Sequence, residues 1–362
     1  MTITRDGLDK LRLIRSAQIG PVTYMQLLSR FGSAGAAIEA IPALAARGGG
    51  RAPRLAEEST ILREVERTQK LGARYLFLGD PGYPPLLPHI ETAPAALIVR
   101  GDPALAARAS IGMVGARNAS AAACRFARML AQDLGERGAI IVSGLARGID
   151  TAAHMGSIGS GTVAVIASGI DISFPPENAA LQERIGAEGL LITEQAPGTQ
   201  PLARHFPSRN RIIAGMATGT VVVEAAPRSG SLITARLAAE AGREVMAVPG
   251  SPLDPRAQGC NQLIREGATL IQNAADVLEA IGPIDQRMVR QEQAGFTSAP
   301  ALQDASEQER RSLSNLLGPV PVPVDELIRQ SALSPALVQM VLLELELAGR
   351  LERHAGGRVS LV

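Results

Sequence analysis

Residues 111–120 read IGMVGARNAS, a short apolar run that turns at Gly115 into a polar segment and then into a helical pattern. The same alternation recurs through the middle of the chain. Its candidate strands are residues 111–114, 139–142, 162–167, 190–193, 220–224 and 244–248, and its candidate helices lie near 119–136, 150–158, 178–187, 209–217 and 231–242. Strands that alternate with helices predict an α/β fold with a doubly wound, mainly parallel sheet. Ligands bind outside the carboxyl ends of such strands, so a site is expected in the turns that follow them.

The segment before the sheet has the spacing of short helices. Apolar residues recur at helical intervals over residues 8–46 and are interrupted by Ile19-Gly20-Pro21. This pattern predicts a helical module of the SAM or helix-hairpin-helix type, which we interpret as a packing module rather than a contact for DNA phosphates. A loop at Gly48-Gly49-Gly50 and a charged helix over residues 55–71 are expected to follow.

The end of the chain predicts a further small domain. Residues 283–305 are rich in Gln, Ala, Ser and Pro without a helical or strand period, which is typical of a flexible linker. Residues 306–362 show three helices and a hairpin rich in Arg and Gly, the order of a winged helix. We therefore expect a helical module at 1–75, a Rossmann-like domain at 76–282, the linker at 283–305 and a winged helix at 306–362.

The charge is too balanced for a protein that coats nucleic acid indiscriminately. The net charge is +1, and residues 76–282 hold 16 basic and 18 acidic side chains. A grip on DNA then has to come from a few placed arginines and backbone amides. Lys10 and Lys70 are the only lysines among 36 basic residues, so the cations are almost all Arg, whose planar fork suits phosphate. With no Trp, three Tyr and six Phe, an extended base-stacking platform is not expected.

Several classes of protein are disfavoured by what the chain lacks. Cys124 and Cys260 form no CxxC pair and the four histidines have no ligand spacing, so we expect neither a disulfide framework nor a metal site, and no cofactor. Lys10 and Lys70 lie outside any GxxxxGK[ST] loop, which excludes nucleotide hydrolysis by that route. No apolar run approaches the ~20 residues that span a bilayer, and we expect a cytoplasmic protein without membrane association.

Three turns at the predicted carboxyl strand ends share one construction. The first contains Gly115 and Arg117, and it lacks the GxGxxG spacing of a dinucleotide site. The second is SGLARGID at 143–150, and the third is RSGSLIT at 228–234. Glycine allows close backbone approach, a helix start offers unpaired N–H groups, and Arg adds a cation that binds two oxygens. Turns of this kind predict phosphate binding.

A fourth segment, RHFPSRNR at 204–211, brings three arginines and a phenylalanine to the start of a helix. Clustered donors beside one aromatic ring suit phosphate contacts with a single stacked base. Alternatively, Arg209 and Arg211 are ion-pair partners of Glu194 or Glu224 within the fold, and for Arg211 the two interpretations are equally good. We expect Glu194 and Glu224 to neutralise arginines rather than to contact a ribose.

Asp150 and His154 lie four residues apart, so a helix that begins at Asp150 would place them on one face. There they could form an acid–base pair. Helix capping by Asp150 is the simpler interpretation, and we prefer it.

Taken together, these segments resemble the DNA-processing protein A family, also called Smf. The matching set covers about residues 80 to 280 and is specific as an ordered series, although each piece alone is not. It comprises DPGYPPLL at 80–87, VGARNAS at 114–120, VSGLARGIDTAAH at 142–154, FPPEN at 174–178, FPSRNRIIAG at 206–215, VVVEAAPRSGSLITARLAAEAGR at 221–243, AVPGSP at 247–252 and GCNQLIREGA at 259–268. Two departures are Arg204, where the family often has Lys before the Phe, and Phe174, where it usually has Tyr.

The resemblance implies a non-catalytic protein that binds single-stranded DNA, dimerises through its Rossmann-like domain, protects incoming DNA and helps to load the RecA recombinase in natural transformation. Motif matching and the turns above give one set of DNA-contact candidates. They are Gly115, Arg117, Ser143, Gly144, Arg147, Arg204, Phe206, Arg209, Asn210, Ser229, Gly230 and Ser231.

The winged helix carries no basic surplus, since its third helix has Glu344 and Glu346 with Arg350 near its end. A helix that reads a groove presents Arg, Lys, Asn or Gln. We therefore expect this domain to bind protein, or to pack on its own chain, rather than to bind duplex DNA.

Two other functions compete with this hypothesis. One is a nucleotide-processing, phosphoribohydrolase-like enzyme, but the PGGxGT turn of such enzymes is here Pro227-Arg228-Ser229-Gly230-Ser231, which argues against hydrolysis. The other is a structural adaptor whose phosphate turns bind no oligonucleotide.

Overall fold

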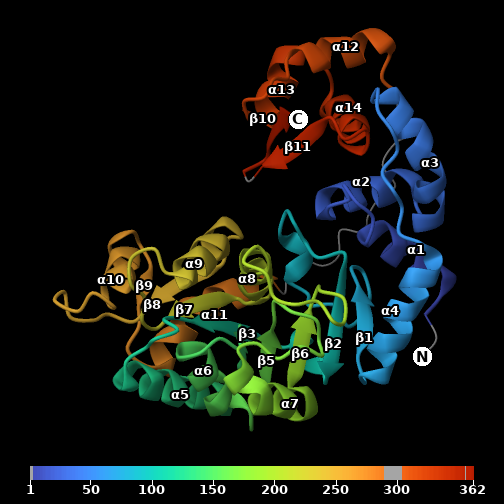
Figure 1. Ribbon diagram of the computed structural model, residues 1–362. Coiled ribbons are helices and arrows are strands. Elements are labelled where there is room, and N and C mark those ends of the chain that lie inside the picture. The colour runs from blue at the N-terminus through green and yellow to red at the C-terminus, as the bar shows by residue number, and fades with distance from the viewer. Residues whose placement is uncertain (1–2, 289–303, 355) are drawn as a thin grey trace. The chain divides into compact units, whose positions relative to one another are not determined.

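The computed structural model describes residues 3–288, 304–354 and 356–362 (Figure 1). The chain forms two compact units. One runs from Glu64 through the central sheet, and the other joins the N-terminal segment up to Arg63 to the C-terminal segment that ends at Val362.

The sheet of the first unit has the strand order β1-β2-β6-β5-β4-β3-β7-β8-β9. Strands β3 to β9 run parallel to their neighbours among themselves, whereas β2 is antiparallel to both β1 and β6. The order reverses at β3, which lies between β4 and β7, and such a switch point is where α/β sheets bind ligands. The strands are β1 (Arg74–Phe77), β2 (Ala96–Gly101), β3 (Ser110–Val114), β4 (Ile140–Ser143), β5 (Thr162–Val165), β6 (Leu190–Thr193), β7 (Gly219–Val222), β8 (Glu244–Ala247) and β9 (Thr269–Leu270).

Helices cover both faces of this sheet, so the central strands are buried throughout and read as continuous apolar runs. One face packs on α8 (His205–Met216), α9 (Gly230–Glu240) and α10 (Gln258–Arg265). The other packs on α5 (Ala121–Glu136), α6 (Ile149–Ser157), α7 (Ala179–Glu188) and α11 (Ala274–Met288). In Figure 1, α8 and α9 lie on one side of the strands and α5, α6 and α7 on the other. The predicted doubly wound fold is confirmed.

The second unit contains the predicted helical module and the winged helix. The module has α1 (Arg5–Ile14), α2 (Pro21–Phe31) and α3 (Ala34–Arg47), and α4 (Glu58–Lys70) crosses the division between the units. Pro21 starts α2 at a position where its missing N–H costs nothing, and Gly32 ends that helix in a left-handed conformation. The winged helix has α12 (Glu307–Asn315), β10 (Val322–Pro323), α13 (Val324–Ser331), α14 (Pro335–Leu347), β11 (Leu351–His354) and β12 (Arg358–Leu361).

Some expected boundaries differ from the structure. Helix α8 begins at His205 rather than near 209, and α11 continues to Met288, past residue 283 where the linker was expected to begin. Most of the proposed linker, residues 289–303, lies outside the described residues, so the linker stays a prediction. None of the described helices is long and apolar enough to cross a membrane.

Candidate nucleic-acid interface

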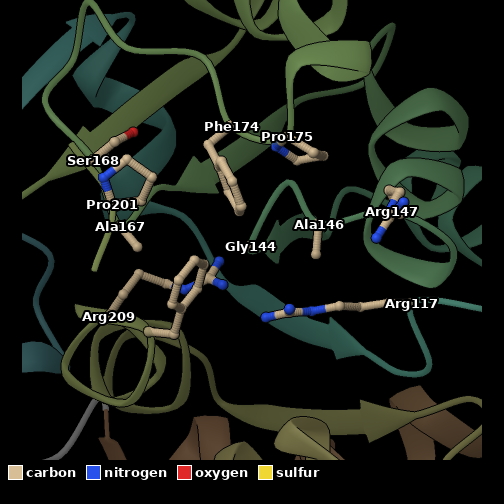
Figure 2. A pocket seen from close by; sticks show the side chains of 11 residues that line it. Arg117, Gly144, Ala146, Arg147, Ala167, Ser168, Phe174, Pro175, Pro201 and Arg209 are labelled. Atoms are coloured by element: carbon tan, nitrogen blue, oxygen red, sulfur yellow. The ribbon is translucent and has the colours of Figure 1, made fainter. Parts of the chain in front are cut away.

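Four loops meet at the carboxyl ends of the central strands. They line two adjoining hollows of about 510 and 50 Å³, which share Arg117, Ala146, Phe206 and Arg209 and which we call the crevice. Figure 2 shows the Arg117 and Arg209 side chains directed toward one another near Gly144, with Phe174 and Pro175 across from them. Segments from four predicted motifs therefore do converge at one edge of the sheet.

The first turn supplies a cation that packs against a ring of α8. The Arg117 guanidinium lies 5.2 Å from the centre of the Phe206 ring, and the Phe206 and Phe174 rings are 5.7 Å apart at an interplanar angle of 57°. Gly115 allows the turn to pack closely on Ile149, because a Cβ at position 115 would lie 2.5 Å from Cγ1 of Ile149. Arg117 and two aromatic rings thus form one continuous wall of the crevice.

The second turn is held by Asp150. Its Oδ2 accepts the backbone N–H of Gly144 at 3.2 Å and that of Ala146 at 3.3 Å. Burial raises the pKa of the Asp150 carboxyl, which Arg209 and the two N–H groups oppose. Gly144 is required sterically, since a Cβ at this position would lie 1.6 Å from Nη1 of Arg209.

Arg209 is a buried cation at the floor of the crevice. Arg209 is 7% exposed, and its Nη1 donates to the Val165 carbonyl oxygen at 2.8 Å. Burial lowers the pKa of Arg209 to about 10, so the side chain keeps its charge at neutral pH. Within the described residues, neither Arg117 nor Arg209 forms an ion pair with a carboxylate. The alternative that paired Arg209 with Glu194 or Glu224 was wrong. The buried carboxyl of Asp150 acts electrostatically on Arg209 and on Arg117 without forming an ion pair with either, so the crevice holds two cations beside one buried carboxyl group.

The third turn opens the start of α9 to the larger hollow. Ser229 caps α9, its Oγ accepts from the Ser231 N–H, and the two hydroxyl oxygens are 2.8 Å apart. A Cβ at Gly230 would meet nothing within 4 Å, so the backbone here is open to a ligand. Asn210 Nδ2 donates to the Gly230 carbonyl oxygen at 3.4 Å and ties α8 to this turn.

Two candidates lie apart from this arrangement, and a third lies at its exposed margin. Ser143 is fully buried and its Oγ donates to the Met113 carbonyl oxygen at 2.6 Å, so its side chain serves the fold. Arg204 is exposed at the N-cap of α8 and lines neither hollow. Arg147 lines the smaller hollow, but its guanidinium is 3.4 Å from Glu177 and 58% exposed.

The structure decides three of the open alternatives. Arg211 pairs with Glu194 at 2.6 Å and also donates to the Thr92 carbonyl oxygen, so it belongs to the fold. Glu224 forms no ion pair with an arginine among the described residues, and its electrostatic effect on Arg256 is smaller than that of Asp254. The Glu224 carboxylate accepts from the N–H and hydroxyl of Ser120, the residue that caps α5.

The third alternative concerned Asp150 and His154. Capping by Asp150 was wrong in detail, because the N-cap of α6 is Gly148 and Asp150 instead holds the preceding turn. The acid–base pair is excluded as well. His154 is buried with Nδ1 2.8 Å from the Thr162 hydroxyl, and burial, with a smaller effect of Arg209, lowers the pKa of His154 to about 3.

Sequence reasoning missed two residues that line the crevice. Phe174 is 43% exposed and faces Phe206, and its signal was the rarity of phenylalanine in a chain with six. Arg228 is exposed beside the start of α9 with a positive φ of 63°. That backbone conformation turns the chain sharply before Ser229, and no local pattern marks it.

Comparison with known proteins agrees with the motifs. Residues 74–282 match the family model of DNA recombination-mediator protein A, residues 4–66 the DprA-like N-terminal HHH domain and residues 297–357 the DprA winged helix domain. The chain is 34% identical to protein Smf of Synechocystis over 326 residues, 81% of each chain. It is 47% identical to DNA processing protein DprA of Streptococcus pneumoniae over 201 residues, 55% of this chain and 71% of the relative.

Two solved structures share the fold. The crystal structure of DNA processing protein A from S. pneumoniae superposes with a TM-score of 0.65 at 33% identity, covering 78% of this chain and 99% of the other. DNA processing protein A from Helicobacter pylori, a protein described by its single-stranded DNA binding mode, superposes with a TM-score of 0.53 at 25% identity, covering 59% and 97%.

Proposed function

The chain belongs to the DNA processing protein A family, and on that premise we propose that it binds single-stranded DNA in the crevice. The observation that carries the proposal is the meeting of Arg117 and Arg209 without an ion-paired carboxylate, beside the rings of Phe206 and Phe174. Two cations that outnumber the buried carboxyl of Asp150 beside them suit a phosphate, and an exposed aromatic face suits a base that is not paired.

The form of the site favours a single strand over a duplex. Base stacking on Phe174 needs an unstacked base, which a duplex offers only after unpairing. The phosphate grip also extends along the crevice, from Arg117 to the open backbone at Gly230, and Ser229 and Ser231 provide hydroxyl donors there. We propose Gly115, Arg117, Gly144, Arg147, Phe206, Arg209, Asn210, Ser229, Gly230 and Ser231 as the residues that form or support this site, with Phe174 and Arg228 added.

We propose further that the chain acts without catalysis, as a cytoplasmic protein. The two buried carboxylates nearest the crevice are engaged in the fold, Asp150 with two N–H groups and Glu224 with Ser120. A phosphoribohydrolase would need a carboxylate directed at its substrate. Incubation with nucleoside monophosphates should release no base.

Its wider role, on our proposal, is to protect incoming DNA and to help load the RecA recombinase in natural transformation. Family membership supports this role. A homodimer through the sheet-containing unit is supported by the two-residue strand β9 at the sheet edge, where Leu270 is 45% exposed, and by Leu253, which is 92% exposed in the segment between β8 and α10. Sedimentation of a Leu253→Arg variant against the unmodified chain tests the dimer.

A binding titration over a series of salt concentrations tests the DNA proposal. We expect single strands of unrelated sequence to bind with similar affinity, more tightly than duplexes, and with an affinity that falls steeply as salt rises because phosphates dominate the contact. Equal affinity for duplex and single strand, or affinity insensitive to salt, would contradict the proposal.

A further inference from the structure

The third helix of the winged helix is buried on two sides. Val338, Val341, Leu342 and Leu345 of α14 belong to the core of the winged helix itself. Met340, Leu343, Glu344 and Leu347 are also buried but lie outside that core. Each set repeats at i, i+3, i+4 and i+7, and the two are offset by two residues, so they form stripes on nearly opposite faces. The second stripe therefore needs a partner beyond the winged helix.

That partner is the N-terminal helical module. Helix α14 packs along α3. The loop after α3 lies so close to the end of α14 that two of its glycines leave no room for a side chain. A Cβ on Gly48 would lie 2.1 Å from the Glu344 carbonyl oxygen, and one on Gly50 would lie 2.2 Å from that of Ala348. The glycine run that the sequence marked only as a loop thus makes room for a helix from the other end of the chain.

A buried carboxylate closes this contact. Glu344 is 1% exposed, and its two oxygens lie 2.9 Å from Nε of Arg47 and 2.7 Å from Nε of Arg310. Arg47 comes from the module and Arg310 from the winged helix, so one carboxylate pairs with both parts. We call these residues, Arg47, Gly48, Gly50, Arg310 and Glu344, the seam.

Further polar contacts extend the seam. Nε2 of Gln26 in α2 donates to Oε1 of Gln339 at 2.7 Å, and the amide oxygen of Gln26 accepts from Arg353 at 3.2 Å. Arg350 donates to the Gly48 carbonyl oxygen at 3.1 Å. Groove-reading helices keep one face free and carry donors on it, whereas α14 has no Lys or Arg and both of its apolar stripes are covered.

From these contacts we propose that the N-terminal module is the resident partner of the winged helix, so that the two ends of the chain fold as one domain and α14 is unavailable to read a DNA groove. The two predicted small domains are then halves of a single one. The interface uses apolar area, a desolvated charge cluster and glycine contacts, which are features of a permanent contact rather than a transient one.

Cleavage of the chain between its ends tests the proposal. A protease recognition sequence is placed within residues 289–303 of the full-length protein, and the folded protein is cut and passed over a size-exclusion column. We expect the C-terminal fragment to elute with the remainder of the chain at micromolar concentration. Elution of the folded fragment by itself would overturn the proposal.

Two glycine variants separate the seam from general folding. Gly48→Ala combined with Gly50→Ala should weaken retention of the fragment at least tenfold, because both new methyl groups collide with the backbone of α14. Gly20→Ala combined with Gly318→Ala is the matched control, since neither new methyl group would meet an atom within 4 Å. Equal retention in the two double variants would overturn the assigned seam.

Addition of duplex DNA completes the test. If α14 is unavailable, a saturating duplex oligonucleotide leaves the cleaved fragment bound to the remainder of the chain. Transfer of the fragment onto the duplex would show that α14 leaves the module to bind DNA, and would overturn the proposal.

Discussion

In the crevice, Arg117 and Arg209 face one another and no carboxylate of the described residues forms an ion pair with either, whereas in the seam Arg47 and Arg310 both pair with the carboxylate of Glu344, and Arg47 pairs with Asp304 as well. Both places gather arginines, and a sequence count would not distinguish them. The difference lies in where the negative charge comes from. The arginines of the seam are ion-paired with carboxylates of the chain itself, while the two cations of the crevice share only the buried carboxyl of Asp150, with which neither is ion-paired, and an external anion can bind them.

The same contrast applies to the glycines. Gly48 and Gly50 allow one part of the chain to approach another, and Gly144 makes room for a buried cation under an open hollow. Gly230 meets nothing within 4 Å and leaves its backbone open. A glycine therefore indicates a ligand site only when the space beside it is empty, and each of the following variants tests one side of this comparison.

The largest effect is expected from Glu344→Ala. The substitution leaves Arg310 partly buried without its ion-paired carboxylate and leaves Arg47 with Asp304 alone, and breaking such a buried pair costs about 3 kcal/mol of unfolding free energy. Urea denaturation should show this loss, while the affinity for single-stranded DNA, which we assign to the other unit, should not change. Glu352→Ala, at an exposed position, is the control and should shift stability by less than about 0.5 kcal/mol.

Gly144→Ala comes next. Its methyl group would lie 1.6 Å from Nη1 of Arg209, which cannot retreat because that atom is bonded to the Val165 carbonyl oxygen. Overpacking of this kind costs roughly 2 kcal/mol, and displacement of Arg209 should weaken DNA binding as well. Gly230→Ala is the matched control, with open space around the new methyl group, and it should leave stability unchanged. Equal losses in both variants would show that the crevice tolerates no side chain anywhere.

A smaller effect is expected from Arg117→Ala. Loss of one phosphate contact should reduce affinity for every oligonucleotide roughly tenfold, or about 1.4 kcal/mol, and should lower the slope of log affinity against log salt by about 1. Fluorescence anisotropy over a salt series measures both quantities. Arg311→Ala removes an arginine that is likewise exposed, at 77%, from the other unit and should leave both unchanged. A matching decrease in the two variants would mean that net charge, not the crevice, governs binding.

The fold could be predicted where burial repeats along the chain. All six expected strands are present in the structure. They could be predicted because parallel strands covered on both faces are continuous apolar runs, a pattern that is visible in the sequence without the tertiary structure. Strands β1, β2 and β9 were missed. Leu270 is half exposed in a strand of two residues, and β1 and β2 add to the sheet in the antiparallel sense, so neither extends the alternation of strand and helix.

The site was predicted at the level of loops but not at the level of partners. Arg117 and Phe206 were identified because turns after parallel strands meet at one edge. The partners of Arg209, Arg211 and Glu224 are set by which groups lie within about 3 Å of them in the folded chain. The spacing of residues along the sequence does not reveal those groups. The same holds for Glu344, whose partner Arg47 lies nearly the whole chain away.

The smallest effect concerns His154, which lies beneath the crevice and has no counterpart in the seam. Burial lowers the pKa of His154 from its ordinary value of 6.5 to about 3, so the unfolded chain takes up a proton that the folded chain refuses. Stability is therefore complete above pH 6.5 and falls as the pH decreases, by about 0.7 kcal/mol between pH 7 and pH 6. His154→Gln removes the titrating group and should reduce this pH dependence by that amount in paired urea denaturations. An unchanged dependence in the variant would mean that His154 takes up its proton in the folded chain, next to a charged Arg209.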